Sequence, residues 1–217
     1  MKVKICGIRT LEEARWSIDS GADFLGFNFY PPSPRSISVE ECRRITRFLR
    51  RESPSTVLVG VFVNQPAHQV LETLEYCELD LAQLSGDEAL EEQFLLGERA
   101  YKALRLPQGA QAITLDRHFY LRNTPPAFLV DASLPGQYGG TGHPTDWKLA
   151  AWLAAQHPIF LAGGLTPDNV AQAIREVRPW GVDVASGVEA EPGKKERSKI
   201  EAFIRNAHRA FAALRES

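Results

Sequence analysis

Short runs of β-branched and aromatic residues alternate with longer amphipathic segments along this chain of 217 residues. The short runs predict eight strands, over residues 3–6, 24–29, 57–63, 79–84, 101–106, 127–131, 159–162 and 182–185. The longer segments predict helices over residues 11–20, 39–50, 66–77, 89–96, 111–121, 146–156, 169–177 and 197–215. Strict alternation at this spacing is typical of right-handed βαβ units, and eight such units fit a closed barrel. We therefore expect an α/β fold, a (β/α)8 TIM barrel that forms a single catalytic domain over residues 1–217.

An open, doubly wound sheet is the alternative fold for such an alternation. Sheets of that kind bind dinucleotides through a G-x-G-x-x-G sequence directly after the first strand. The first predicted strand instead ends in the sequence Cys6-Gly7-Ile8-Arg9. The sequence therefore gives little support to a dinucleotide site.

The composition argues against several functional classes. The chain has 25 Lys and Arg against 27 Asp and Glu and no basic stripe with interleaved aromatics, so we expect no nucleic-acid partner. No apolar run approaches the roughly 20 residues that a membrane span needs. Met1 to Lys4 leads directly into a strand, which predicts a cytoplasmic protein without membrane contact. The three cysteines lack a C-x-x-C pair and the five histidines lack metal spacing, which argues against disulfides and a bound metal.

Two glycine-containing turns lie one βα unit apart between residues 159 and 189. Gly163 and Gly164 follow the seventh predicted strand, and Ser186 and Gly187 follow the eighth. In a barrel both turns open on the same face, where their backbone N–H groups can converge on one phosphate. Thr166 is a suitable N-cap for the helix that follows. The alternative is that these glycines only end strands, but the second turn favours a phosphate site.

The ends of other strands carry candidate catalytic side chains, because chemistry in such barrels takes place at the carboxyl ends of strands. Cys6 ends the first strand, Asp131 ends the sixth, and Arg35 lies in a proline-rich loop after the second. Each residue also has a simpler interpretation. Cys6 could be a small buried hydrophobe, Asp131 a turn residue and Arg35 an ordinary surface arginine.

Seven motifs extend from Lys4 to Gly193 in an order and spacing similar to those of phosphoribosylanthranilate isomerases. They are KICGIRT, GADFLGFNFYPPSPRSIS, VGVFVNQP, QLSGDE, VDASLPGQYGGTG, LAGGLTPDNV and GVDVASGVE. The resemblance implies a (β/α)8 barrel of tryptophan biosynthesis. It implies an Amadori rearrangement of N-(5′-phosphoribosyl)anthranilate to 1-(2-carboxyphenylamino)-1-deoxyribulose 5-phosphate. It also implies a small phosphorylated substrate and no metal or organic cofactor, and we expect a monomer or homodimer.

The resemblance also implies roles for individual residues. Cys6 corresponds to the general base, Asp131 to the general acid and Arg35 to the residue that binds the anthranilate carboxylate. The two turns, with Gly163, Gly164, Ser186 and Gly187, correspond to the phosphate site. A free thiol has a pKa of about 8.5, so we expect the site to lower the pKa of Cys6, while Asp131 must hold a proton.

The chain departs from the family pattern after the fourth strand, where Ser85 replaces a histidine. A serine cannot carry charge, so we expect the histidine to be dispensable or the activity to be altered. His143-Pro144-Thr145 departs as well. Two competing functions remain. Indole-glycerol-phosphate synthase needs catalytic lysines, and the strand ends offer none, because Lys4 and Lys102 lie within strands. The other competitor is a barrel that binds a phosphorylated ligand without catalysis.

Overall fold

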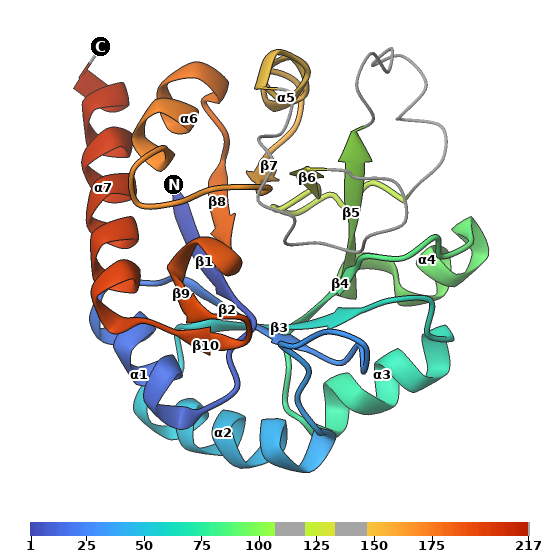
Figure 1. Ribbon diagram of the computed structural model, residues 1–217. Helices are drawn as coiled ribbons and strands as arrows, with labels where there is room; N and C mark the ends of the chain where they lie inside the picture. Colours follow the sequence, from blue (N-terminus) through green and yellow to red (C-terminus); the bar gives the residue numbers. More distant parts are fainter. Residues whose placement is uncertain (107–119, 133–146, 217) are drawn as a thin grey trace.

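The eight predicted strands form a closed, all-parallel barrel in the computed structural model, which describes residues 1–106, 120–132 and 147–216 (Figure 1). The strands are β1 (Lys2–Cys6), β2 (Phe24–Asn28), β3 (Val57–Phe62), β4 (Leu81–Leu84), β5 (Ala100–Leu106), β6 (Phe128–Ala132), β7 (Ile159–Leu161) and β8 (Gly181–Val184). Each strand pairs with the next along the chain, and β8 closes the barrel by pairing with β1. The TIM barrel is therefore confirmed, and the open sheet is excluded.

Helices cover the outside of the barrel (Figure 1). They are α1 (Leu11–Asp19), α2 (Val39–Glu52), α3 (Ala67–Tyr76), α4 (Leu90–Leu96), α5 (Trp147–Ala154), α6 (Val170–Val177) and α7 (Arg197–Glu216). Seven of the eight predicted helices are confirmed with small shifts of their ends. The eighth, over residues 111–121, lies mostly outside the described residues, as do His143-Pro144-Thr145.

Local capping fixes where the helices next to the site begin. Thr10 accepts a hydrogen bond from the backbone N–H of Glu13, and the Glu13 carboxylate accepts one from the N–H of Thr10. This capping box holds the start of α1 close to the end of β1. Before α6, Thr166 and Asn169 form the same kind of reciprocal pair, with one turn of chain between them. The α6 helix proper begins at Val170, so Thr166 caps the turn that precedes it.

The barrel has an apolar outer layer and an interior that changes from apolar to polar. Val3 and Ile5 of β1 pack in the large core between strands and helices. The interior has its own apolar cluster, of Phe24, Val59, Tyr101, Ala103, Leu129, Phe160 and Ala162. Residues two apart on a strand share a face, so Lys4 and Cys6 point inward where Val3 and Ile5 point outward. Lys4, Gln83 and Asp183 are buried polar residues, so polar side chains occupy the interior beneath the mouth.

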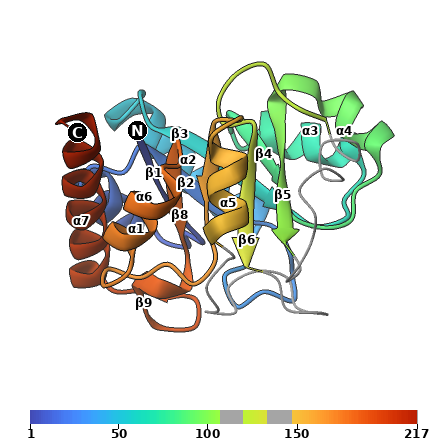
Figure 2. The same ribbon diagram turned by 90° about the horizontal axis from the view of Figure 1, so that it is seen from above.

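A small hairpin that the sequence did not predict follows β8. A 3-10 turn, Ser186–Val188, leads into β9 (Glu189–Glu191), which pairs antiparallel with β10 (Lys194–Lys195). Gly193 has a φ of 83°, which a residue with a side chain rarely adopts. The hairpin lies at the end of the barrel to which the β5 and β6 arrows point (Figure 2). It therefore borders the mouth at which a barrel of this kind carries its site.

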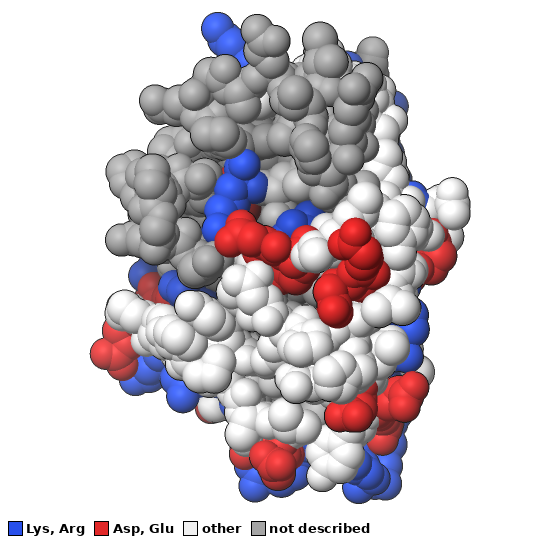
Figure 3. Space-filling model, turned by 90° about the vertical axis from the view of Figure 1, so that its right-hand side faces the viewer, with Lys and Arg blue, Asp and Glu red and all other residues white. Residues whose placement is uncertain are grey.

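Among the described residues on the face drawn in Figure 3, basic and acidic side chains lie interspersed. Within the described ranges, no helix is long and apolar enough to cross a membrane.

Candidate active site at the barrel mouth

A hollow at the carboxyl ends of the strands brings together the predicted catalytic and carboxylate-binding residues. Its volume is about 650 Å³ when the open space at its mouth is counted. Cys6, Arg35 and Asp131 all line it, although they lie on β1, in the loop after β2 and on β6. Because β1 pairs with β2 and β8 whereas β6 pairs with β5 and β7, Cys6 and Asp131 approach the hollow from separated strands.

Cys6 is buried next to a cation inside the barrel. The Lys4 ammonium lies 3.0 Å from an Asp183 carboxylate oxygen and 3.0 Å from the Gln83 side-chain oxygen. Although burial favours the neutral amine, the Asp183 carboxylate raises the pKa of Lys4 above its ordinary value. Burial also raises the pKa of the Cys6 thiol, and the ammonium groups of Lys4 and Lys195 only partly oppose this shift. The expected lowering of the pKa of Cys6 is therefore wrong, because burial of the thiol disfavours its charged form.

Two carboxylates face the hollow. Asp131 lines both the hollow and a second, smaller pocket next to it. Asp183 lines the same two spaces from β8, and its side chain is 7% exposed and paired with Lys4. Asp183 therefore points into the barrel, where a buried ammonium group contacts its carboxylate.

Arg35 lies above Gly7, the residue that directly follows Cys6. A β-carbon on Gly7 would be 2.9 Å from the Arg35 Cδ, so the stem of Arg35 packs closely over this glycine. The side chain of Arg35 is 13% exposed and forms an ion pair with Glu189. It is therefore a buried side chain of the site rather than an ordinary surface arginine.

The two glycine turns lie side by side and form a second, smaller pocket. Gly163 and Gly164 have φ values of 87° and 65°, both in the region that favours glycine. Gly187 is required for close approach, because a β-carbon there would lie 1.9 Å from the carbonyl oxygen of Leu165. The pocket is lined by Gly163, Gly164, Ser186 and Asp131, among others, so it adjoins the larger hollow. The predicted phosphate site and the predicted catalytic pair are thus next to each other.

Ser85, which stands in place of the family histidine, also lines the hollow. Its hydroxyl oxygen accepts a hydrogen bond from Gln83 at 3.1 Å, and Gln83 also bonds Lys4. The backbone carbonyl of Ser85 accepts from Arg105. Ser85 therefore continues a polar chain that begins at Lys4.

The lysines near the mouth are engaged by carboxylates. Lys102 contacts Glu88, and its ammonium also donates to the backbone carbonyls of Leu84 and Gly86. Lys195 of the hairpin is a further buried lysine, paired with Glu189 at 2.9 Å. Sequence reasoning missed Lys195 and Glu189, because no hairpin was expected between the Ser186-Gly187 turn and the last helix. Within the described residues, no group of three or more His, Cys, Asp and Glu could hold a metal.

Comparisons with known proteins agree with this geometry. A family model described as N-(5'phosphoribosyl)anthranilate (PRA) isomerase matches residues 3–206. The N-(5'-phosphoribosyl)anthranilate isomerase of Pelobacter propionicus is 47% identical over 209 residues, which are 95% of this chain and 95% of that protein. The phosphoribosyl anthranilate isomerase from Thermotoga maritima is similar with a TM-score of 0.82 at 40% identity, covering 96% of this chain and 98% of that one.

A second solved structure of this isomerase contains a ligand. It is a complex with reduced 1-(o-carboxyphenylamino)-1-deoxyribulose 5-phosphate, and it is similar to this chain with a TM-score of 0.78 at 38% identity. The match covers 96% of this chain and 98% of that one. The present chain belongs to the N-(5'-phosphoribosyl)anthranilate isomerase family.

Proposed function

We propose that residues 1–217 form a single catalytic domain that isomerises N-(5′-phosphoribosyl)anthranilate to 1-(2-carboxyphenylamino)-1-deoxyribulose 5-phosphate in tryptophan biosynthesis. The observation that carries this proposal is the shared hollow, in which a thiol and a carboxyl group approach from separated strands beside a pocket of glycine turns. A related structure binds the reduced product, which supports the same substrate class here.

Asp131 acts first in the proposed mechanism, as the general acid. Its proton passes to the ring oxygen of the ribose, the bond between C1 and that oxygen breaks, and the nitrogen lone pair forms an iminium with C1. Cys6, as thiolate, then removes the proton from C2. The electrons of that C–H bond form a C1=C2 double bond and neutralise the nitrogen. Tautomerisation of the resulting enol gives the ketone at C2 and protonates C1, so the sequence needs no redox partner.

The raised pKa of Cys6 is compatible with a base that acts only on the opened substrate. The iminium is a cation formed beside Cys6, and a nearby positive charge favours the thiolate over the thiol. The Lys4 and Lys195 ammonium groups already act in that direction. We infer that the iminium charge of the opened substrate lowers the pKa of Cys6 to the value that base catalysis needs. The free enzyme alone does not lower it that far.

The two ends of the substrate would be held away from the reacting carbons. Arg35 can bind the anthranilate carboxylate through two parallel hydrogen bonds. The turns of Gly163, Gly164, Ser186 and Gly187 can offer backbone N–H groups to the phosphate, as is usual after the seventh and eighth strands of such barrels.

Fluorescence-monitored turnover of N-(5′-phosphoribosyl)anthranilate by the intact chain tests this function. We expect substrate to be consumed and the carboxyphenylamino-deoxyribulose phosphate to appear in equal amount. Binding of the substrate without any turnover at high protein concentration would identify a non-catalytic binder and overturn the proposal. A monomer or a homodimer remains our prediction for the oligomeric state, and sedimentation velocity distinguishes the two.

A further inference from the structure

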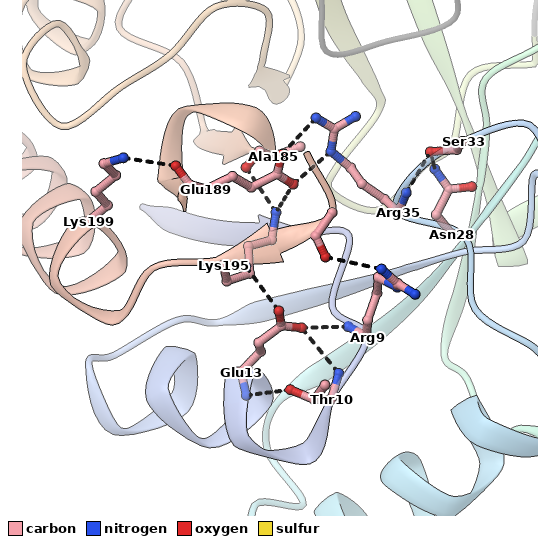
Figure 4. A network of polar contacts seen from close by, with 11 residues as sticks. Arg9, Thr10, Glu13, Asn28, Ser33, Arg35, Ala185, Glu189, Lys195 and Lys199 are labelled. Carbon is pink, nitrogen blue, oxygen red and sulfur yellow. Dashed lines mark hydrogen bonds and ion pairs between the residues drawn. The ribbon is translucent and has the colours of Figure 1, made fainter. Parts of the chain in front are cut away.

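A cluster of buried charges on the β9–β10 hairpin lies against Arg35, and the chemistry above does not use it. Figure 4 shows Glu189 between Lys195 and Arg35. The side chain of Glu189 is 3% exposed and that of Lys195 is fully buried. Removing charges from water costs several kcal/mol per ion unless they are well paired. Hydrophobic side chains could have filled the same space, so the retained charges point to a role beyond packing.

Glu189 holds Arg35 by one defined edge of its guanidinium. The Arg35 Nε donates to Glu189 Oε1 at 2.8 Å, and Nη2 donates to Oε2 at 2.9 Å. This fork fixes the plane of the guanidinium and its rotation about the stem. Within the part of the chain that the structure describes, Glu189 is the only side chain that bonds this group. The adjacent edge, formed by Nη1 and the second N–H of Nη2, can take another carboxylate in the same bidentate manner.

The carboxylate of Glu189 is itself kept ionised and in place. Lys195 donates to Glu189 Oε1 at 2.9 Å and to the backbone carbonyl of Ala185 at 2.9 Å. Burial alone would raise the pKa of Glu189, but the hydrogen bond from Arg35 and the charge of Lys195 together lower it below its ordinary value. Glu189 therefore presents a charged fork to Arg35 at neutral pH.

The hairpin that carries Glu189 is tied to three other parts of the mouth. The backbone N–H of Lys195 donates to Glu13 in the capping box of α1, and Lys199 of α7 donates to the carbonyl of Glu189. A β-carbon on Gly193 would lie 2.2 Å from the carbonyl oxygen of Pro34, so the hairpin turn touches the residue before Arg35. The β9–β10 hairpin thus contacts Arg35 at two places, at its guanidinium through Glu189 and beside its backbone at Pro34.

We propose that Glu189 is a positioning residue that aims the second edge of the Arg35 guanidinium at the carboxylate of the substrate. Lys195 keeps Glu189 charged and keeps the group of three charges net positive, as an anionic substrate requires. This inference rests on the proposed function, because it gives Arg35 the anthranilate carboxylate as its ligand.

The direction in which KM changes in Glu189→Gln distinguishes a positioning role from a purely electrostatic one. Glu189→Gln removes a negative charge beside Arg35, so the cluster of Arg35, Glu189 and Lys195 becomes more positive by one charge. If only charge mattered, the substrate anion would bind more tightly and KM would fall. If Glu189 aims the guanidinium, the loss of one arm of the fork lets Arg35 rotate, and KM rises.

We expect Glu189→Gln to raise KM for N-(5′-phosphoribosyl)anthranilate by roughly three- to thirtyfold and to leave kcat within about threefold, as loss of uniform binding requires. Inhibition by anthranilate should weaken in parallel, whereas inhibition by inorganic phosphate should not change. Glu191→Gln is the matched control, because Glu191 lies on the same hairpin with its side chain 66% exposed. That variant should behave as the parent chain.

A double-mutant cycle with Arg35→Met completes the test. With Arg35 absent, Glu189→Gln should cause no further rise in KM, because the two residues act through one contact. Should Glu189→Gln fail to fold, Glu189→Asp keeps the charge but shortens the fork, and its KM should also rise. A KM that falls or stays unchanged in a folded variant overturns the inference. Absence of turnover by the parent chain would instead overturn the proposed function, so the two failures are distinguishable.

Discussion

Arg35 shows how one residue can be assigned in part from the sequence and in part only from the fold. The proline-rich loop and the family resemblance predicted a carboxylate-binding arginine at this position. Its packing over Gly7 joins two neighbouring strand ends, and its fork with Glu189 joins residues that are 154 positions apart in the sequence. No local sequence pattern predicts such a contact, because the contact forms only when the barrel closes.

The first prediction concerns the contribution of this arginine. Arg35→Met should mainly raise KM, since a carboxylate remote from the reacting carbons is bound alike in the ground and transition states. Hydrogen bonds to charged groups contribute about 1.5–3 kcal/mol, so kcat/KM should fall by roughly ten- to hundredfold. Steady-state kinetics of the variant measure this loss. A change of less than about twofold would remove Arg35 from the site.

The second prediction concerns the ionisation of Cys6. Because burial raises the pKa of this thiol, the thiol form persists at neutral pH, and the thiolate appears only above the ordinary pKa of about 8.5. The difference in ultraviolet thiolate absorbance between the parent and Cys6→Ser reports this titration, and kcat/KM, which reflects the free enzyme, should rise with pH over the same range. A thiolate that forms below about pH 7 would contradict the burial argument.

At the scale of an element, the turns after β7 and β8 were predicted from the sequence, whereas the hairpin that follows them was not. Their glycines were visible in the sequence, and their positive φ values and close approach agree with the predicted backbone cradle. The β9–β10 hairpin was not predicted, because it is only a few residues long and its alternating charges resemble a solvated surface loop. Its glutamate and lysine are nevertheless buried against the site.

The third prediction tests the cradle through its closest contact. Gly187→Ala places a methyl group where the Leu165 carbonyl oxygen would be 1.9 Å away, so the two turns must separate. Inhibition by inorganic phosphate should weaken, and KM should rise more than kcat falls. Gly97→Ala is the control, since nothing lies within 4 Å of a β-carbon added at Gly97. Equal phosphate inhibition in both variants would place the phosphate elsewhere.

At the scale of the whole molecule, the barrel was predictable because the hydrophobic periodicity within each βα unit identifies its strand and its helix. All eight strands were found, and parallel closure followed from their number and alternation. The electrostatics of the mouth were not predictable. Whether Cys6 has a raised or lowered pKa depends on burial and on Lys4, Asp183 and Lys195, which come from separate elements. The sequence therefore predicts which residues meet at the mouth more reliably than it predicts their protonation.

The central claim is that a carboxyl group on one side of the barrel mouth and a thiol on the other move the protons of the rearrangement. Measurement of kcat for Asp131→Asn with N-(5′-phosphoribosyl)anthranilate tests it most directly, because asparagine keeps the shape of aspartate without a transferable proton. Positioned acids contribute roughly 10²- to 10⁴-fold, so kcat should fall by that factor while substrate affinity survives, as for Cys6→Ser. A kcat within about threefold of the parent would show that Asp131 is not the acid.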